Sequence, residues 1–211
     1  MNYKSLDTIR SYVEFNSKEN PKLNFISCPQ TNKTISNEKL KINLDKINFY
    51  LTKEKKQKKN SIICTLIENS LSSIQLMMGI MYSGMIQVPL NLVAGLEQLS
   101  YIVKHSGSEI IFSSSKNIDL AKKIIQKVPN KVMLIEIDKD NFIDGIDNSF
   151  EILEDVTEYK DNALLMYTSG TTGKPKGAML SHENIIQGGK NVMISHELNS
   201  KDKALCVLPL Y

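Results

Sequence analysis

The chain has 211 residues, of which 41% are hydrophobic and 23% charged, a composition typical of a globular protein with a sizeable core. This length corresponds to one domain or two at most. The formal net charge of +3 comes almost wholly from lysine, because Arg10 is the only arginine, and tryptophan is absent. Proteins that recognise nucleic acids rely on arginine forks and stacked aromatic rings, so nucleic acid is excluded as a partner.

The cysteine content and the lack of a secretory signal or a membrane-spanning stretch in the sequence indicate the cellular compartment. The chain has three cysteines, Cys28, Cys64 and Cys206, which lie far apart in the sequence. An odd number of widely spaced cysteines suits reduced thiols rather than a disulfide framework. Cys64 and Cys206 lie in apolar runs, and we expect both to be buried. The N-terminus lacks the apolar core of a secretory signal, and no stretch has the apolar length that spans a bilayer. The sequence therefore predicts a cytoplasmic protein.

The middle of the chain alternates short apolar runs with longer amphipathic segments. Strands are expected at residues 61–67, 87–90, 109–113 and 131–137, and helices from Asn69 and Ser70 onward, over 96–107 and over 117–130. Leu71, Ile74, Met77, Met78 and Met81 recur at helical spacing, which predicts that the methionines pack in the core. Strands that alternate with helices of this length form parallel βαβ units with right-handed crossovers. The predicted fold class is α/β.

Three segments interrupt or precede this pattern. Thr52–Asn60 contains five lysines and one acid, and we expect a solvated loop, with contact to an anionic membrane or a polyphosphate as the alternative. Asp138–Asn148 is spaced like a calcium loop, but Phe142 and Ile143 stand where a ligand and the turn glycine belong, so a plain loop is expected. The first 35 residues are too irregular to assign.

The informative segment runs over residues 162–184, NALLMYTSGTTGKPKGAMLSHEN. A loop that binds polyphosphate needs free backbone N–H groups, hydroxyl donors and a cation, and glycines permit the required backbone angles. Four hydroxyls and two lysines around two glycines exceed what a plain turn requires. The candidate phosphate-binding residues are Thr168, Ser169, Gly170, Thr171, Thr172, Gly173, Lys174 and Lys176.

This segment differs from a Walker A loop, which has four residues between its first glycine and the Gly-Lys pair. Only two residues separate Gly170 from Gly173. Pro175 favours extended geometry at Lys174, so the chain is expected to leave the loop as a strand rather than as a helix. We therefore predict a hairpin with the candidate phosphate loop at its tip.

Other catalytic arrangements do not match the spacing of the sequence. Ser169 does not lie in a nucleophile elbow, and the three histidines lack the intervals and the acidic neighbours of a metal site. His105 is predicted to be a helix-surface residue, and His196 is likewise expected to have no site role. His182 follows the loop closely, and its role is left open. The sequence thus offers neither a metal ligand nor a catalytic residue.

The run YTSGTTGKPKG with the following LSHEN resembles the phosphate-loop signature of the AMP-forming adenylating superfamily, which includes acyl-CoA synthetases, amino-acid adenylation domains and luciferases. The likeness extends to SIICTLIENS, MYSGMIQVPLN and LSYIVKHSGSEIIF before the loop, and to KALCVLPLY after it. In this family the position of Lys174 is variable, whereas that of Lys176 is nearly always basic. The resemblance therefore favours Lys176 as the phosphate-binding cation.

The resemblance implies a two-step reaction, in which a carboxylate attacks the α-phosphorus of ATP and a thiol then takes the acyl group from the acyl-adenylate. The implied substrates are ATP with Mg²⁺, a carboxylic acid such as a fatty acid, and coenzyme A or an acyl carrier protein. The loop would stabilise charge on the leaving pyrophosphate. Amino-acid adenylation stays an alternative, although TTG in the loop and LSHEN after it favour an acyl-CoA synthetase.

The resemblance also implies a domain assignment. Residues 1–211 correspond to an incomplete N-terminal, ATP-binding domain, without the C-terminal domain of the family. The glutamate that binds Mg²⁺, the aspartate that binds ribose and the catalytic lysine of the family have no counterpart in this chain. We therefore expect the 211 residues alone to be inactive, with a strand ending at Tyr211, and a non-catalytic nucleotide-binding fragment is the remaining alternative.

Overall fold

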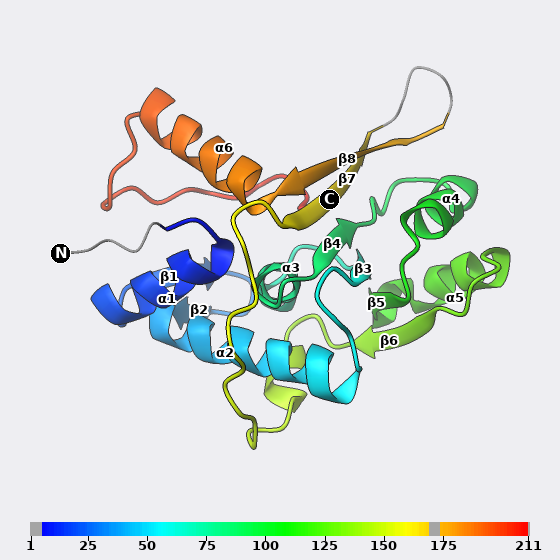
Figure 1. Ribbon diagram of the computed structural model, residues 1–211, viewed down its shortest axis with the longest axis horizontal. Coiled ribbons are helices and arrows are strands. Elements are labelled where there is room, and N and C mark those ends of the chain that lie inside the picture. The colour runs from blue at the N-terminus through cyan, green and yellow to red at the C-terminus, as the bar shows by residue number, and fades with distance from the viewer. Residues whose placement is uncertain (1–5, 169–173, 211) are drawn as a thin grey trace.

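The computed structural model describes residues 6–168 and 174–210. Within these ranges a six-stranded sheet has the order β6-β5-β3-β4-β7-β8, and β1 (Asn24–Cys28) pairs with β2 (Lys33–Ser36) in a separate sheet (Figure 1). The larger sheet consists of β3 (Ile62–Leu66), β4 (Ile86–Pro89), β5 (Ile110–Ser114), β6 (Met133–Ile137), β7 (Asn162–Thr168) and β8 (Lys176–Ser181). All neighbours in it are parallel except β7 and β8. The predicted α/β class and parallel βαβ units are confirmed.

The helices begin and end where local signals in the sequence place them. They are α1 (Ile9–Glu19), α2 (Asn37–Phe49), α3 (Leu71–Tyr82), α4 (Leu96–Ser106), α5 (Ile118–Lys127) and α6 (His182–Ser195). The Ser70 side chain caps α3 by accepting from the Ser73 N–H, and Gly107 ends α4 in the left-handed conformation with φ of 73°. None of the helices in these ranges is long and apolar enough to cross a membrane.

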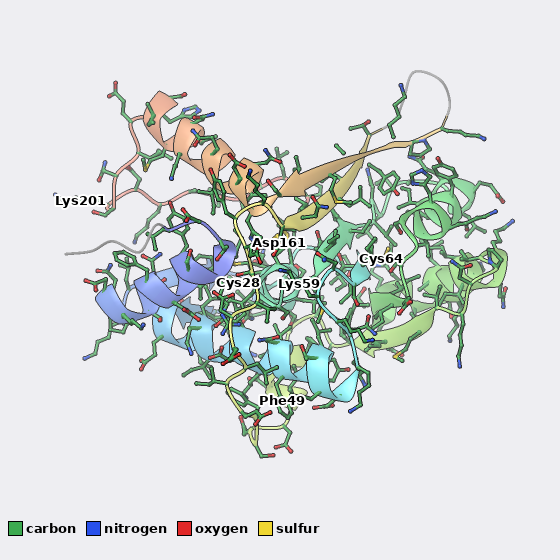
Figure 2. The ribbon with its side chains drawn as sticks, viewed as in Figure 1. Cys28, Phe49, Lys59, Cys64, Asp161 and Lys201 are labelled. Carbon is green, nitrogen blue, oxygen red and sulfur yellow. The ribbon has the colours of Figure 1, made fainter. Side chains whose placement is uncertain are left out.

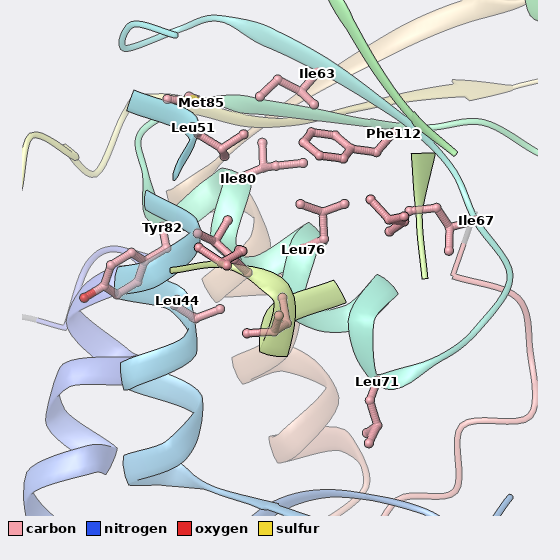
Figure 3. Packing of buried hydrophobic residues seen from close by; sticks show 14 of the residues in the cluster. Leu44, Leu51, Ile63, Ile67, Leu71, Leu76, Ile80, Tyr82, Met85 and Phe112 are labelled. Carbon is pink, nitrogen blue, oxygen red and sulfur yellow. The ribbon is translucent and has the colours of Figure 1, made fainter. Parts of the chain in front are cut away.

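The parallel strands separate two apolar cores. Ile63, Ile110 and Phe112 point to the face covered by α2 and α3, and this core is drawn in Figure 3. Their neighbours Cys64 and Ile111 point to the opposite face, where α4 and α5 pack. Side chains alternate along a strand, so a buried parallel strand must be apolar in both directions. This explains why these strands appear in the sequence as continuous apolar runs.

The predictions for sulfur-containing residues are mostly confirmed. Met81 is buried, and Met77 and Met78 pack against the cores as partly buried residues. Cys64 is fully buried, and burial raises the pKa of its thiol to about 11. The prediction for Cys206 is wrong, because its side chain is exposed. The expected strand there is also wrong, since residues 203–210 form none, and Leu205, Val207 and Leu208 are exposed.

The structure resolves the segments that the sequence left unassigned or placed in solvent. Residues 9–19 form α1, which begins with a capping box between Thr8 and Ser11. The lysine-rich stretch is not simply a solvated loop: Tyr50–Glu54 continues α2 as a π-helical turn, and Lys59 lies 2.8 Å from Asp161. The predicted loop at 138–148 is confirmed outside one short 3-10 turn.

The apolar residues that break the calcium pattern anchor that loop. The turn covers Phe142–Gly145. Ile143 within the turn and Ile146 directly after it are buried in the α2–α3 core. The Phe142 ring contacts the rings of Tyr50 and Phe112, with centroids 5.9 and 5.8 Å away. The loop is therefore a packing element.

We expect Gly79→Ala to destabilise the protein by about 1–3 kcal/mol, because overpacking forces helices apart. A Cβ at Gly79 would lie 2.6 Å from Ile47 Cγ2, where α3 approaches α2. Gly188→Ala in α6 is the matched control, since its Cβ would meet nothing within 4 Å. Urea unfolding measures both variants. Equal stability of Gly79→Ala and wild type would contradict the close approach of the two helices.

Candidate functional site

The predicted hairpin is present, and it is formed by β7 and β8. The two strands pair antiparallel from Asn162 opposite Ser181 to Thr168 opposite Lys176. Directly opposed residues place their side chains on the same face of a sheet with Cβ atoms about 5 Å apart. The Thr168 hydroxyl and the Lys176 ammonium group thus flank the end of the hairpin together.

The parallel sheet determines where the hairpin tip points. β7 joins β4 in parallel register through Gln87 and Leu164, so Thr168 lies at the carboxyl edge of the sheet. This is the edge at which open α/β sheets bind their ligands. Of the candidate residues, Ser169, Gly170, Thr171, Thr172 and Gly173 lie outside the described residues, and their phosphate role stays a prediction.

The described residues at the tip carry unopposed positive charge. Lys174 and Lys176 are exposed, and neither makes an ion pair with a described side chain. Pro175 between them is buried, and its ring fixes φ where the chain enters β8. The tip therefore presents two cations and the Thr168 hydroxyl to a ligand from outside the hairpin. An anion with several oxygens fits these groups.

Contacts with α4 hold the stem of the hairpin. The Tyr167 hydroxyl and His105 Nδ1 are 2.8 Å apart, and burial raises the Tyr167 pKa to about 12. A Cβ at Gly177 would lie 2.9 Å from Leu165 Cδ1 and 3.3 Å from Tyr167 Cζ, so glycine at this position leaves room for the two side chains of β7. His105 is exposed on its helix as predicted. Its contact with Tyr167, 62 residues away, leaves no signal in the sequence.

The base of the hairpin is anchored to the N-terminal part of the chain through His182. Its side chain is fully buried, and its Nδ1 accepts a hydrogen bond of 3.2 Å from the Ile9 N–H. The backbone N–H of His182 donates to the Asp161 carbonyl at 3.0 Å, and the Asp161 carboxylate pairs with Lys59 (Figure 2). His182 thus joins α6, the start of α1 and the segment that leads into β7. The sequence left its role open, and the structure makes it an anchor.

Arg10 forms a second anchor beside the first. Its guanidinium donates to the Leu153 carbonyl at 2.6 Å and to the Glu154 carbonyl at 3.2 Å. It also lies over the Tyr82 ring, 4.6 Å from the centroid. The one arginine of the chain therefore holds the segment before β7 against α1 and α3. Sequence analysis missed this residue, because its partners Leu153 and Glu154 are 143 and 144 positions away and leave no local signal.

Comparison with known proteins agrees with this architecture. The N-terminal domain of FACL13 from Mycobacterium tuberculosis matches 97% of this chain and 52% of that chain, with a TM-score of 0.85 and 22% identity. That similarity shows the fold. The model of the AMP-binding enzyme family matches residues 13–211. The chain belongs to the AMP-binding enzyme family, which confirms the resemblance found in the sequence.

Curated relatives include two kinds of enzyme. Sulfoacetate–CoA ligase from Cupriavidus necator is 30% identical over 152 residues, which are 71% of this chain and 30% of that protein. Gramicidin S synthase 2 from Brevibacillus brevis is 28% identical over 127 residues, which are 60% of this chain and 3% of that protein. The chain thus spans less than a third of the length of either relative.

We expect the buried His182 to make the protein less stable in mild acid. Burial lowers the His182 pKa below its ordinary 6.5, and Lys59 adds to this effect while Asp161 and Asp155 oppose it. His182 then binds a proton more readily in the unfolded chain than in the folded chain. Its contribution to the free energy of unfolding is therefore complete above about pH 6.5 and is lost as the pH falls below that value. The free energy of unfolding should fall by up to about 1.4 kcal/mol per pH unit more than in His182→Asn.

Urea unfolding of wild type and His182→Asn between pH 7.5 and 5.5 measures this difference. The variant keeps a small polar acceptor near the Ile9 N–H but removes the titrating ring. Parallel stability profiles of the two proteins over this range would show that His182 does not stay neutral in the folded chain.

Proposed function

We propose that this chain forms the ATP-binding part of an AMP-forming acid–thiol ligase of the acyl-CoA synthetase type. The observation that carries the proposal is the hairpin tip at the carboxyl edge of the sheet, where the side chains of Lys174, Lys176 and Thr168 make no hydrogen bond or ion pair with a described residue. Membership of the AMP-binding enzyme family supports ATP as the ligand. The domain assignment follows the same proposal: residues 1–211 form part of an N-terminal, ATP-binding domain.

In the proposed reaction a carboxylate oxygen of the acid attacks the α-phosphorus of ATP, and the bond to pyrophosphate breaks. A thiol sulfur then attacks the acyl carbon, and AMP leaves. The hairpin tip would act in the first step. The Lys176 ammonium group and the hydroxyls of Thr168, Ser169, Thr171 and Thr172 would bind the β- and γ-phosphates and stabilise charge on the leaving pyrophosphate.

Mg²⁺ would accompany ATP when it binds. Over 6–168 and 174–210, no three His, Cys, Asp or Glu side chains gather in a position to hold a metal ion. The contribution proposed for this chain is the binding of the phosphates by its backbone amides, hydroxyls and lysines.

The acid and the acceptor are proposed as a fatty or other organic acid and coenzyme A. The name of the sulfoacetate–CoA ligase supports coenzyme A as the acceptor, together with the TTG and LSHEN of the loop. The match to a gramicidin synthetase favours a second candidate, amino-acid adenylation with transfer to a carrier protein. Acid-dependent exchange between ATP and pyrophosphate, measured with fatty, aromatic and amino acids on the complete protein that contains this chain, separates the two. Absence of exchange with every acid in a folded protein would favour a non-catalytic nucleotide-binding role.

We expect Lys176→Ala to lower kcat/KM for this exchange by about ten- to a thousandfold, as the loss of a group that stabilises transition-state charge does. Lys190→Ala is the matched control, because Lys190 is an exposed lysine on α6, away from the hairpin tip. The control should exchange at the wild-type rate. Wild-type kinetics in Lys176→Ala would refute the assignment of the pyrophosphate site to the hairpin.

A further inference from the structure

Three aromatic rings join the stem of the hairpin to α4. Tyr101 and His105 lie one turn apart on the same side of α4, and their rings stack with centroids 5.3 Å apart and 29° between the planes. The Tyr167 ring of β7 stands nearly perpendicular to the His105 ring, at 85°, with centroids 5.8 Å apart. His105 is exposed to solvent, yet its ring contacts one ring of its own helix and one ring of the hairpin.

A hydrogen bond gives this contact a direction. The Tyr167 hydroxyl oxygen and His105 Nδ1 are 2.8 Å apart. Burial raises the pKa of Tyr167 to about 12, and Cys64 and Tyr101 add to the effect, so the phenol keeps its proton and can donate it. A neutral imidazole accepts at Nδ1 when its own proton lies on Nε2. With the phenol as donor, His105 takes this tautomer.

Tyr167 also contacts the second strand of the hairpin. It lies opposite Gly177 in the register of β7 and β8. A Cβ at Gly177 would come within 3.3 Å of Tyr167 Cζ, so the ring lies directly against this glycine. The ring also packs, partly buried, on the core between the sheet and the helices α4 and α5. Its position therefore determines how the stem of the hairpin lies on α4.

The next pair of residues toward the tip carries candidate phosphate-binding groups. Thr168 follows Tyr167 and pairs with Lys176, which precedes Gly177. The side chains of Thr168 and Lys176 make no hydrogen bond or ion pair with a described residue, so the stem must hold them. β8 has a neighbour on one side only within the sheet, and the contact of Tyr167 with α4 limits the tilt of the stem. A displacement of about 1 Å can slow a reaction by about a hundredfold.

We propose that His105 is a positioning residue. By accepting the hydrogen bond of the Tyr167 hydroxyl, it fixes the stem of the hairpin on α4 and thereby places Thr168 and Lys176 where they meet the phosphates of the nucleotide. The structural part of the proposal, the hydrogen bond and the tautomer, stands alone. Its catalytic consequence rests on the proposed function.

The structural part is tested by ¹⁵N spectroscopy of the histidine side chains. The His105 Nδ1 resonance should be that of an acceptor nitrogen, with the proton on Nε2. Tyr167→Phe removes the donor and keeps the ring, so this resonance should shift. Tyr12→Phe is the matched control, because Tyr12 lies on α1, on the opposite side of the molecule from α4 (Figure 1). A proton on Nδ1 in the wild type, a resonance unchanged in Tyr167→Phe, or an equal shift in the control would overturn the proposal.

The catalytic consequence is tested in the complete protein by ATP–pyrophosphate exchange. His105→Leu and Tyr167→Phe should each raise the KM for ATP about tenfold, the size expected for one hydrogen bond of ordinary strength, and leave the KM for the acid within about twofold. The double variant should resemble either single variant, because both remove the same bond. His105→Gln should recover most of the wild-type KM, since its side-chain oxygen can accept from the phenol.

His196→Leu is the matched control for the kinetics. His196 is an exposed histidine at the end of α6, and it should keep the wild-type KM for ATP after substitution. Wild-type constants in both single variants, a double variant whose effect is the product of the single effects, or an equal effect in the control would overturn the positioning role. A wild type that exchanges with no acid would refute the proposed function, and the ¹⁵N spectra would then decide whether His105 accepts from Tyr167.

Discussion

The fold depends on the need to bury both faces of a parallel sheet. Each central strand supplies alternate apolar side chains to two cores, as Ile63 and Cys64 do in β3, and helices must cover both faces. Crossover connections are right-handed. A connection that adds a strand on one side of the sheet and a connection that adds a strand on the other side therefore cover opposite faces. The carboxyl edge of the sheet is consequently open where they diverge. The hairpin tip, which is the candidate phosphate site, lies at that edge.

Buried polar groups hold the antiparallel hairpin against this parallel frame. The hairpin needs supports because β8 has a neighbour on one side only within the sheet. Arg10 holds the segment before β7, and its neighbour Tyr82 donates to Asp45 Oδ1 at 2.8 Å, with burial raising the Tyr82 pKa above its ordinary value. His182 holds the base from the other side. A buried polar group costs free energy when it has no hydrogen-bond partner. These contacts therefore favour the one position of the hairpin in which they form.

Sequence reasoning succeeded where the signal was local. Apolar runs, caps and the proline after Lys174 were sufficient to predict the parallel strands, the helices α3, α4 and α5 and the hairpin, because each depends on a few neighbouring residues. It failed where the deciding partner was distant, because Lys59 was placed in solvent although Asp161 pairs with it. It also failed at Cys206, which was placed in the core although its side chain is exposed. In the candidate site, sequence placed Thr168 and the lysines at one loop. It could not supply the anchors, which join segments far apart in the chain.

The most direct test of the account is an amide ¹H–¹⁵N titration of the chain with ATP and Mg²⁺. The account predicts saturable shifts at Thr168, Lys174 and Lys176, at the tip of the hairpin, with α5 unchanged because it covers a face of the sheet rather than its carboxyl edge. Shifts confined to other parts of the chain, with the amides of Thr168 and Lys176 unmoved at saturation, would contradict the central claim that this hairpin binds the phosphates.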